Sequence, residues 1–190
     1  MKYWIAFFSQ TGSEILDISR RIGRFPDVIV SNNTISNISP KLLSEYEHSD
    51  KNRCIMTGPN VTIDTYKEIL KDCGSKCIVT LNGWLKIIPP EICSNYNIYN
   101  GHPGLISQYP ELRGKDPVER IWVNIDNYTE AGSVIHEVVP AVDEGKIISE
   151  SSFNLSETSF INIEGLNKEI RAHSLNLWVD FLRLKLKLIV

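Results

Sequence analysis

The chain has 190 residues, of which 42% are hydrophobic and 23% charged, and its formal net charge is −3 at pH 7. This length is enough to bury a substantial core and suits a single domain over residues 1–190. The absence of a broad basic field argues against nucleic acid as the main partner. No apolar run reaches the roughly eighteen residues that a membrane span needs, and the chain does not start with a secretion signal. We therefore expect a cytoplasmic protein without a membrane partner.

The four cysteines have no paired CxxC spacing; they are Cys54, Cys73, Cys77 and Cys93. The short gap between Cys73 and Cys77 is only a weak metal signal. Cysteines in a cytoplasmic chain are normally reduced and fill strand or helix positions. We therefore expect four reduced thiols and no metal.

Apolar runs of strand length alternate with segments of helical periodicity along the chain. In chain order the expected elements are a strand at 4–8, a helix at 14–22, a strand at 27–30, a short helix at 41–47, a strand at 54–56, a helix at 62–71, a strand at 76–81, a helix at 89–96, a strand at 97–100, a helix at 117–123, strands at 133–139 and 146–153, and a long helix at 159–182. This alternation predicts an α/β fold with an open, mostly parallel, twisted sheet and helices on both faces. The two late strands, joined by a short loop, would add an antiparallel edge.

Three loops at expected strand ends carry polar residues, and ligands of such sheets bind at the carboxyl ends of strands. Residues 9–13, SQTGS, form a small-residue turn before a helix, which suits a phosphate or is simply a tight turn. Residues 99–114 form a long loop that contains Asn100 and His102. Residues 141–145, AVDEG, contribute Asp143. Each of these residues could be an ordinary turn former, but together they supply the amide, imidazole and carboxylate that acyl transfer to an amine needs.

Four segments in this order resemble the folate-dependent formyltransferases, and most of all those that act on glycinamide ribonucleotide. They are FFSQTGSE at 7–14, NGWLKIIPPEICSNY at 82–96, the Asn-Gly-His-Pro segment at 100–103, and SVIHEVVPAVDEGKII at 133–148. The resemblance implies a Rossmann-like formyltransferase fold and a role in one-carbon metabolism, with 10-formyltetrahydrofolate as cosubstrate. It also implies direct attack by the amine, without a metal or a covalent enzyme intermediate.

The resemblance assigns roles to individual residues. Asn100 would bind the formyl oxygen, His102 would share a proton, and Asp143 would hold His102, favour its charged form and organise a water. The folate would lie against two segments, namely Trp84, Leu85, Lys86, Ile87 and Ile88, and Val139, Ala141 and Val142. His136 falls within an expected strand and is interpreted as a core or rim residue.

The amine acceptor is expected to carry a phosphate bound by Gln10, Thr11, Gly12 and Ser13, with the first-turn Glu14 facing solvent. Glycinamide ribonucleotide, an intermediate of purine synthesis, is the leading candidate. The family's acceptor-binding Arg and Glu are replaced by Ile63 and Ala172, however, so other acceptors stay open. The alternatives are another amine such as an amino-sugar nucleotide, a folate hydrolase, and a non-catalytic folate- or nucleotide-binding relative. The oligomeric state is not indicated.

Overall fold

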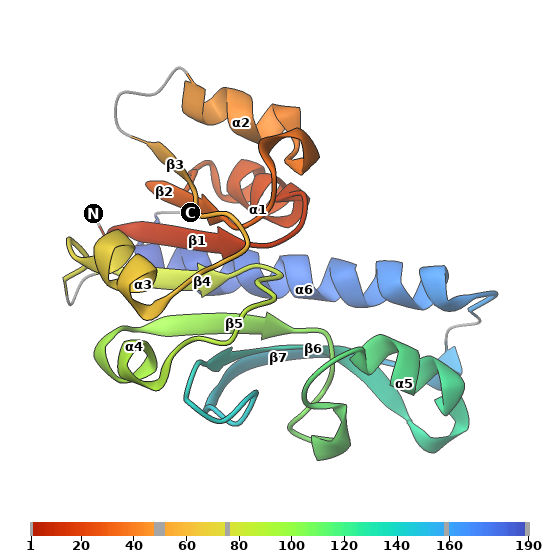
Figure 1. Cartoon of the computed structure of the whole chain (residues 1–190). Coiled ribbons are helices and arrows are strands. Elements are labelled where there is room, and N and C mark those ends of the chain that lie inside the picture. Colours follow the sequence, from red (N-terminus) through yellow and green to blue (C-terminus); the bar gives the residue numbers. More distant parts are fainter. Residues whose placement is uncertain (1, 48–51, 75–76, 158–159, 189–190) are drawn as a thin grey trace.

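The computed structural model describes residues 2–47, 52–74, 77–157 and 160–188, which build a seven-stranded sheet in the order β3-β2-β1-β4-β5-β6-β7 (Figure 1). The strands are β1 (Trp4–Phe8), β2 (Val28–Ser31), β3 (Arg53–Met56), β4 (Ile78–Leu81), β5 (Ile98–His102), β6 (Glu130–Glu137) and β7 (Ile147–Asn154). The first five strands are parallel, and β6 and β7 run antiparallel at one edge. The expected fold class, with its antiparallel edge, is confirmed.

Six α-helices lie in the described part of the chain. They are α1 (Ser13–Ile22), α2 (Pro40–Glu47), α3 (Ile63–Leu70), α4 (Pro90–Asn95), α5 (Pro117–Val123) and α6 (Ile163–Leu186). The last helix starts later than expected because Asn162 caps it, accepting a hydrogen bond from the Gly165 N–H. Residues 76 and 159, where one strand and one helix were expected to begin, lie outside the described residues.

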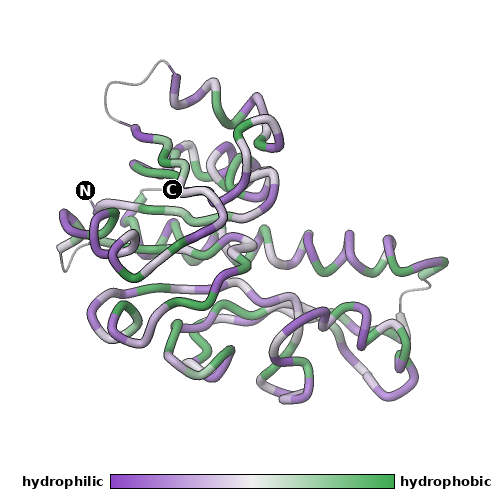
Figure 2. Tube along the Cα trace, viewed as in Figure 1, coloured by the Kyte–Doolittle hydropathy of each residue, from purple (hydrophilic) through white to green (hydrophobic). Residues whose placement is uncertain are grey.

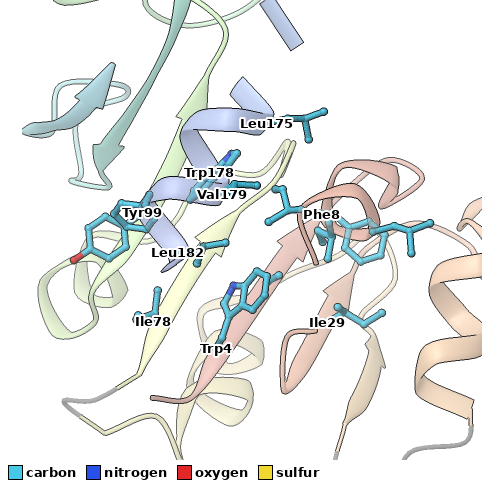
Figure 3. Close-up of a cluster of buried hydrophobic side chains, with 14 of the residues drawn as sticks. Trp4, Phe8, Ile29, Ile78, Tyr99, Leu175, Trp178, Val179 and Leu182 are labelled. Atoms are coloured by element: carbon cyan, nitrogen blue, oxygen red, sulfur yellow. The ribbon is translucent and has the colours of Figure 1, made fainter. Parts of the chain in front are cut away.

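Strand β1 is buried on both faces, which explains its unbroken apolar run. Trp4, Ala6 and Phe8 pack on the side of α1, α2 and α6, as part of the cluster in Figure 3. Ile5 and Phe7 pack on the other side, against side chains of α3 and α4. Helices therefore cover both faces of the parallel strands, and polar residues collect beyond the strand ends.

Helix α6 crosses the sheet and brings its side chains close to the end of β5. Figure 2 shows hydrophobic and hydrophilic residues alternating along it, and its buried face includes Trp178. A Cβ atom on Gly101 would lie only 2.6 Å from Nε1 of Trp178. The glycine thus lets α6 pack directly on the strand that carries Asn100 and His102.

The expectation of four reduced cysteines was wrong for one pair. Cys73 and Cys77, whose Cα atoms are 5.3 Å apart in the turn after α3, form a disulfide, whereas Cys54 and Cys93 are free. Two cysteines four residues apart in a turn can bring their Cβ atoms close enough for a disulfide. The sequence prediction had considered only reduced thiols or a metal site for this pair. In the described part of the chain, no helix is long and apolar enough to cross a membrane.

Candidate active site

Asn100 and His102 lie two residues apart on β5, so their side chains leave the strand on the same side. The antiparallel neighbour β6 places His136 opposite Asn100, and Nδ2 of Asn100 lies 3.2 Å from Nε2 of His136. His102 and His136 are both almost completely buried. The seam between the last parallel strand and the first antiparallel strand therefore holds a polar cluster inside an otherwise apolar sheet.

Asp143, in the loop between β6 and β7, lies between the two imidazoles. Its Oδ2 is 3.3 Å from Nδ1 of His102, and its Oδ1 is 3.3 Å from Nε2 of His136. The backbone N–H of Gly114 donates to Asp143 Oδ2 at 2.8 Å. The structure thus brings together the three residues predicted from sequence, Asn100, His102 and Asp143.

Backbone carbonyls determine which ring nitrogens of the two histidines carry protons. Nε2 of His102 is 2.9 Å from the Leu112 carbonyl, and Nδ1 of His136 is 2.8 Å from the Glu137 carbonyl. A carbonyl only accepts, so both nitrogens donate. The other ring nitrogens, Nδ1 of His102 and Nε2 of His136, then face the Asp143 carboxylate with a lone pair. A proton added to one of these nitrogens would form a charge-assisted hydrogen bond with Asp143. The cluster therefore has a place for an extra proton.

The pKa values show how burial and charge oppose each other here. Burial lowers the pKa of His102 from its ordinary value of 6.5, and Asp143 and the Leu112 carbonyl only partly offset this effect. Burial alone would raise the pKa of Asp143, but His136, His102 and the Gly114 N–H together hold it below its ordinary value of 3.8. The direction of this shift is opposite to the expectation that Asp143 favours the charged form of His102, because burial outweighs the effect of the nearby carboxylate.

The loop after β5 supplies the Leu112 and Gly114 backbone contacts of the cluster, and Arg120 of α5 holds this loop in place. The Arg120 guanidinium donates to the carbonyls of Leu112, Arg113 and Lys115 at 3.1, 2.8 and 2.7 Å, and also to that of Glu111. Arg120 was not predicted from the sequence. No local pattern marks it, because its partners are main-chain atoms.

His136 was also missed as a site residue. It had been interpreted as a core or rim histidine, and it is buried, but it contacts both Asn100 and Asp143. In the tautomer whose Nδ1–H donates to Glu137, Nε2 of His136 accepts from Asn100, which fixes the orientation of that amide. Only the pairing of β5 with β6 reveals this role, and the periodicity of a single strand does not specify its partner.

A cleft of about 610 Å³ opens beside the cluster. Its walls include nearly all the residues predicted to bind folate: Trp84, Leu85, Lys86, Ile87, Ile88, Val139 and Val142. Ala141 does not line it. Leu85 and Ile87 expose 71% and 68% of their surfaces, an apolar area at the mouth of a cleft that suits a flat heterocycle. Trp84 belongs mainly to the core, where its Nε1–H donates to the Tyr66 hydroxyl.

A second cavity, of about 360 Å³, adjoins the cleft and shares Gln10 and Gly101 with it. It is lined by the loop predicted to bind phosphate, including Thr11, Gly12 and Ser13. Glu14 also lines this cavity, and its carboxylate accepts hydrogen bonds from Asn82 Nδ2 and Ser174 Oγ. The expectation that Glu14 faces solvent was therefore wrong, because polar partners inside the fold attract its side chain.

Gly12 has a structural role of its own in this loop. Its φ angle is +73°, and an added Cβ would lie 2.5 Å from Cδ2 of Leu42. Gly12 is thus needed for the turn and for the packing of α2 as much as for any ligand.

The two residues that replace the family's acceptor-binding Arg and Glu lie in ordinary structural positions. Ile63 begins α3 and packs against the core, and Ala172 is exposed on α6. In the part of the chain that the structure describes, no cluster of His, Cys, Asp or Glu is arranged to hold a metal ion.

Comparison with known sequences identifies the family. The sequence model of the formyl transferase family matches residues 62–176, more than half of the chain, including β5, β6 and the Asp143 loop. The chain belongs to the formyl transferase family. It is thus an enzyme of this family, which uses 10-formyltetrahydrofolate as donor. No curated protein sequence matches it significantly.

Solved structures with a similar fold are named as formyltransferases and as a deformylase. A phosphoribosylglycinamide formyltransferase from Anaplasma phagocytophilum has a TM-score of 0.79 and 18% identity, over 98% of this chain and 89% of its own. One from Streptococcus pneumoniae TIGR4 has a TM-score of 0.74 and 20% identity, over 96% and 98%. A formyltetrahydrofolate deformylase from Pseudomonas syringae pv. tomato has a TM-score of 0.73 and 20% identity, over 98% and 62%. At these identities the similarity shows a shared fold.

Proposed function

We propose that this formyl transferase family member moves the formyl group of 10-formyltetrahydrofolate onto a primary amine by direct attack. The observation that carries the proposal is the Asn100–His102–His136–Asp143 cluster, which lines the larger cleft. Its chain neighbours Gly101 and Pro103 line both the cleft and the second cavity. A donor in the cleft and an acceptor in the cavity would meet at Asn100. The catalytic residues are then Asn100, His102 and Asp143, with His136 as a positioning residue.

In the proposed reaction the amine nitrogen forms a bond to the formyl carbon, and the bond from that carbon to N10 of the folate breaks. Asn100 Nδ2 has a second N–H that is free to stabilise the oxyanion of the tetrahedral intermediate. The amine loses one proton and N10 gains one. Asp143, which lines the cleft and contacts His102, accepts the proton from the amine through a water, and His102 shares the resulting charge. The same water can then return a proton to N10.

The predicted folate segments support the placement of the donor. Exposed Leu85, Ile87 and Val142 would cover the pterin or benzoyl rings, with Ile88 and Val139 deeper in the wall. Lys86 stands beside them and could pair with a carboxylate of the glutamate tail. The buried Trp84 would support this wall from behind.

Two observations bear on the identity of the acceptor. The names of the structural neighbours favour glycinamide ribonucleotide and a role in purine synthesis, with its phosphate at Gln10, Thr11, Gly12 and Ser13. The inward carboxylate of Glu14 in the same cavity opposes a phosphate there. The proposed reaction is therefore formyl transfer to a primary amine. Whether that amine carries a phosphate is a separate question, which the binding of phosphate to the cavity can answer.

The hydrolytic alternative is favoured by one observation, the similarity in fold to a formyltetrahydrofolate deformylase. The decisive experiment measures tetrahydrofolate release from 10-formyltetrahydrofolate with and without a panel of primary amines. Amine-dependent release with matching formyl-amine product supports transfer. Equal release without amine would establish hydrolysis, and donor binding without release would indicate a non-catalytic folate-binding relative.

A further inference from the structure

A buried chain of hydrogen bonds ends on the Glu14 carboxylate. Nε1 of Trp4 donates to Oγ1 of Thr80 at 3.0 Å, and that hydroxyl donates to Oδ1 of Asn82 at 2.8 Å. Nδ2 of Asn82 then donates to Oε2 of Glu14 at 3.2 Å. Ser174 of α6 donates to Oε1 at 3.3 Å. Glu14 is thus held in place from strands β1 and β4 and from α6.

The direction of this chain is fixed by its first member. An indole N–H only donates, so Thr80 must accept from Trp4 and uses its own proton toward Asn82. The amide oxygen of Asn82 is then occupied, and its NH₂ group points to Glu14. Every one of these contacts donates toward Glu14, so the fold presents this side chain to the cavity as a hydrogen-bond acceptor.

The charges around the cavity reinforce that preference. The cation that lines it, Arg171, lies 3.3 Å from Asp17 and donates to the Ser13 hydroxyl. Two carboxylates, Glu14 and Asp17, thus stand against one guanidinium. A phosphate placed on the loop at 10–13 would add a third negative group beside a carboxylate that is already partly desolvated.

We propose that Glu14 selects the acceptor, binding a hydroxyl or ammonium group of the amine substrate and excluding a phosphomonoester from this cavity. The inference rests on the proposed formyl transfer and names its substrate class: a primary amine whose far end is rich in hydrogen-bond donors, such as an unphosphorylated amino sugar or a diamine. Asn82 and Ser174 are positioning residues that keep the Glu14 oxygens directed into the cavity.

The test uses Glu14→Gln, which keeps the shape of the side chain and its acceptor oxygen but removes the charge. The control is Asp180→Asn, which removes an exposed carboxylate of α6 outside the cavity. Binding of inorganic phosphate and of ribose 5-phosphate is measured by calorimetry for the wild type and both variants. We expect at least tenfold tighter binding of both probes to Glu14→Gln and a much smaller change for Asp180→Asn. Equal affinity in wild type and Glu14→Gln would overturn the inference.

Turnover provides the second readout, with glycinamide ribonucleotide, an unphosphorylated amino sugar and a diamine as acceptors. The wild type should give the higher kcat/KM with one of the two unphosphorylated amines, and Glu14→Gln should shift the ratio toward the phosphorylated amine by tenfold or more. A wild type that prefers glycinamide ribonucleotide, with an unchanged ratio in the variant, contradicts the inference but leaves formyl transfer intact. If no amine is formylated although the phosphate affinities change as expected, the proposed reaction fails and the selectivity of the cavity for donor groups stands.

Discussion

Asp143 accepts a hydrogen bond of 2.8 Å from the backbone N–H of Gly114, which joins the loop after β6 to the loop after β5. Both residues have left-handed backbones, with φ angles of 55° at Asp143 and 82° at Gly114. Asparagine tolerates this conformation better than most side chains, so Asp143→Asn changes the charge without straining the turn. That substitution therefore isolates the electrostatic role of the carboxylate.

We expect Asp143→Asn to lower kcat for formyl transfer by about 10²- to 10⁴-fold, because the proton released by the amine loses its acceptor. The KM for 10-formyltetrahydrofolate should change little, since asparagine keeps the size of the Asp143 side chain and the apolar walls of the cleft are unchanged. Steady-state kinetics with a thermal unfolding scan would check both points. A variant that unfolds at the same temperature yet keeps full kcat would contradict the assignment.

Asn100→Ala should reduce kcat by about 10²- to 10³-fold through loss of the oxyanion donor. The double variant with His136→Gln should lose less than the sum of the two single losses, because His136 orients the Asn100 amide in addition to its contact with Asp143. Asn176→Ala, which removes an exposed asparagine of α6, is the control. Additive losses in the double variant would show that His136 has an independent role.

Arg120→Ala should lower kcat by about ten- to a hundredfold, because the loop that supplies Leu112 and Gly114 to the cluster loses its clamp. Burial is the main cause of the lowered pKa of His102, and the charge of Arg120 adds a smaller part, so the acidic limb of the pH–kcat profile should move slightly to higher pH. Arg120→Lys retains the charge and should restore the position of that limb while recovering only part of kcat. Arg20→Ala, which removes an exposed arginine of α1, is the control. An unshifted limb in Arg120→Ala would refute the coupling.

Glu14→Gln should raise the free energy of unfolding at pH 7. Burial raises the pKa of Glu14 above its ordinary 4.5, so the native state binds more protons than the unfolded state as pH rises past that value. The stability contribution of Glu14 is therefore fully present below pH 4.5 and is lost as pH rises through the folded pKa. Urea unfolding at pH 7 and pH 4 should show a gain that shrinks at the lower pH, and a constant gain would contradict the role of ionisation.

Gly12→Ala should destabilise the fold more than Gly23→Ala, although both glycines have φ near +70°. Each alanine pays about 1–2 kcal/mol for the left-handed backbone. Only at Gly12 does the new Cβ meet Leu42 and Phe8, which adds about 1–3 kcal/mol of overpacking. Urea unfolding of the two variants measures the difference in the free energy of unfolding. Equal losses of stability would show that α2 shifts to accommodate the added Cβ atom at Gly12.

The sheet was largely predictable from sequence, because buried parallel strands such as β1 and β4 are continuous apolar runs. Asn100, His102 and Asp143 were found because they follow such runs and match a family pattern. His136 and Glu14 were not, since a strand pattern leaves the partner strand open and a first-turn glutamate normally points to water. Their roles depend on Asn100 and Asn82, which lie 36 and 68 residues away along the chain.

The pairing of Asn100 with His136 across β5 and β6 also limits which changes in chain length the enzyme tolerates. Because side chains alternate along a strand, inserting one residue within β6 before His136 would turn its imidazole to the opposite face of the sheet and leave the Asn100 amide without its orienting partner. Insertions at residues 124–129, before β6 begins, leave this pairing intact. Lineages of this enzyme should therefore vary in length at that turn and keep the length of the strand constant.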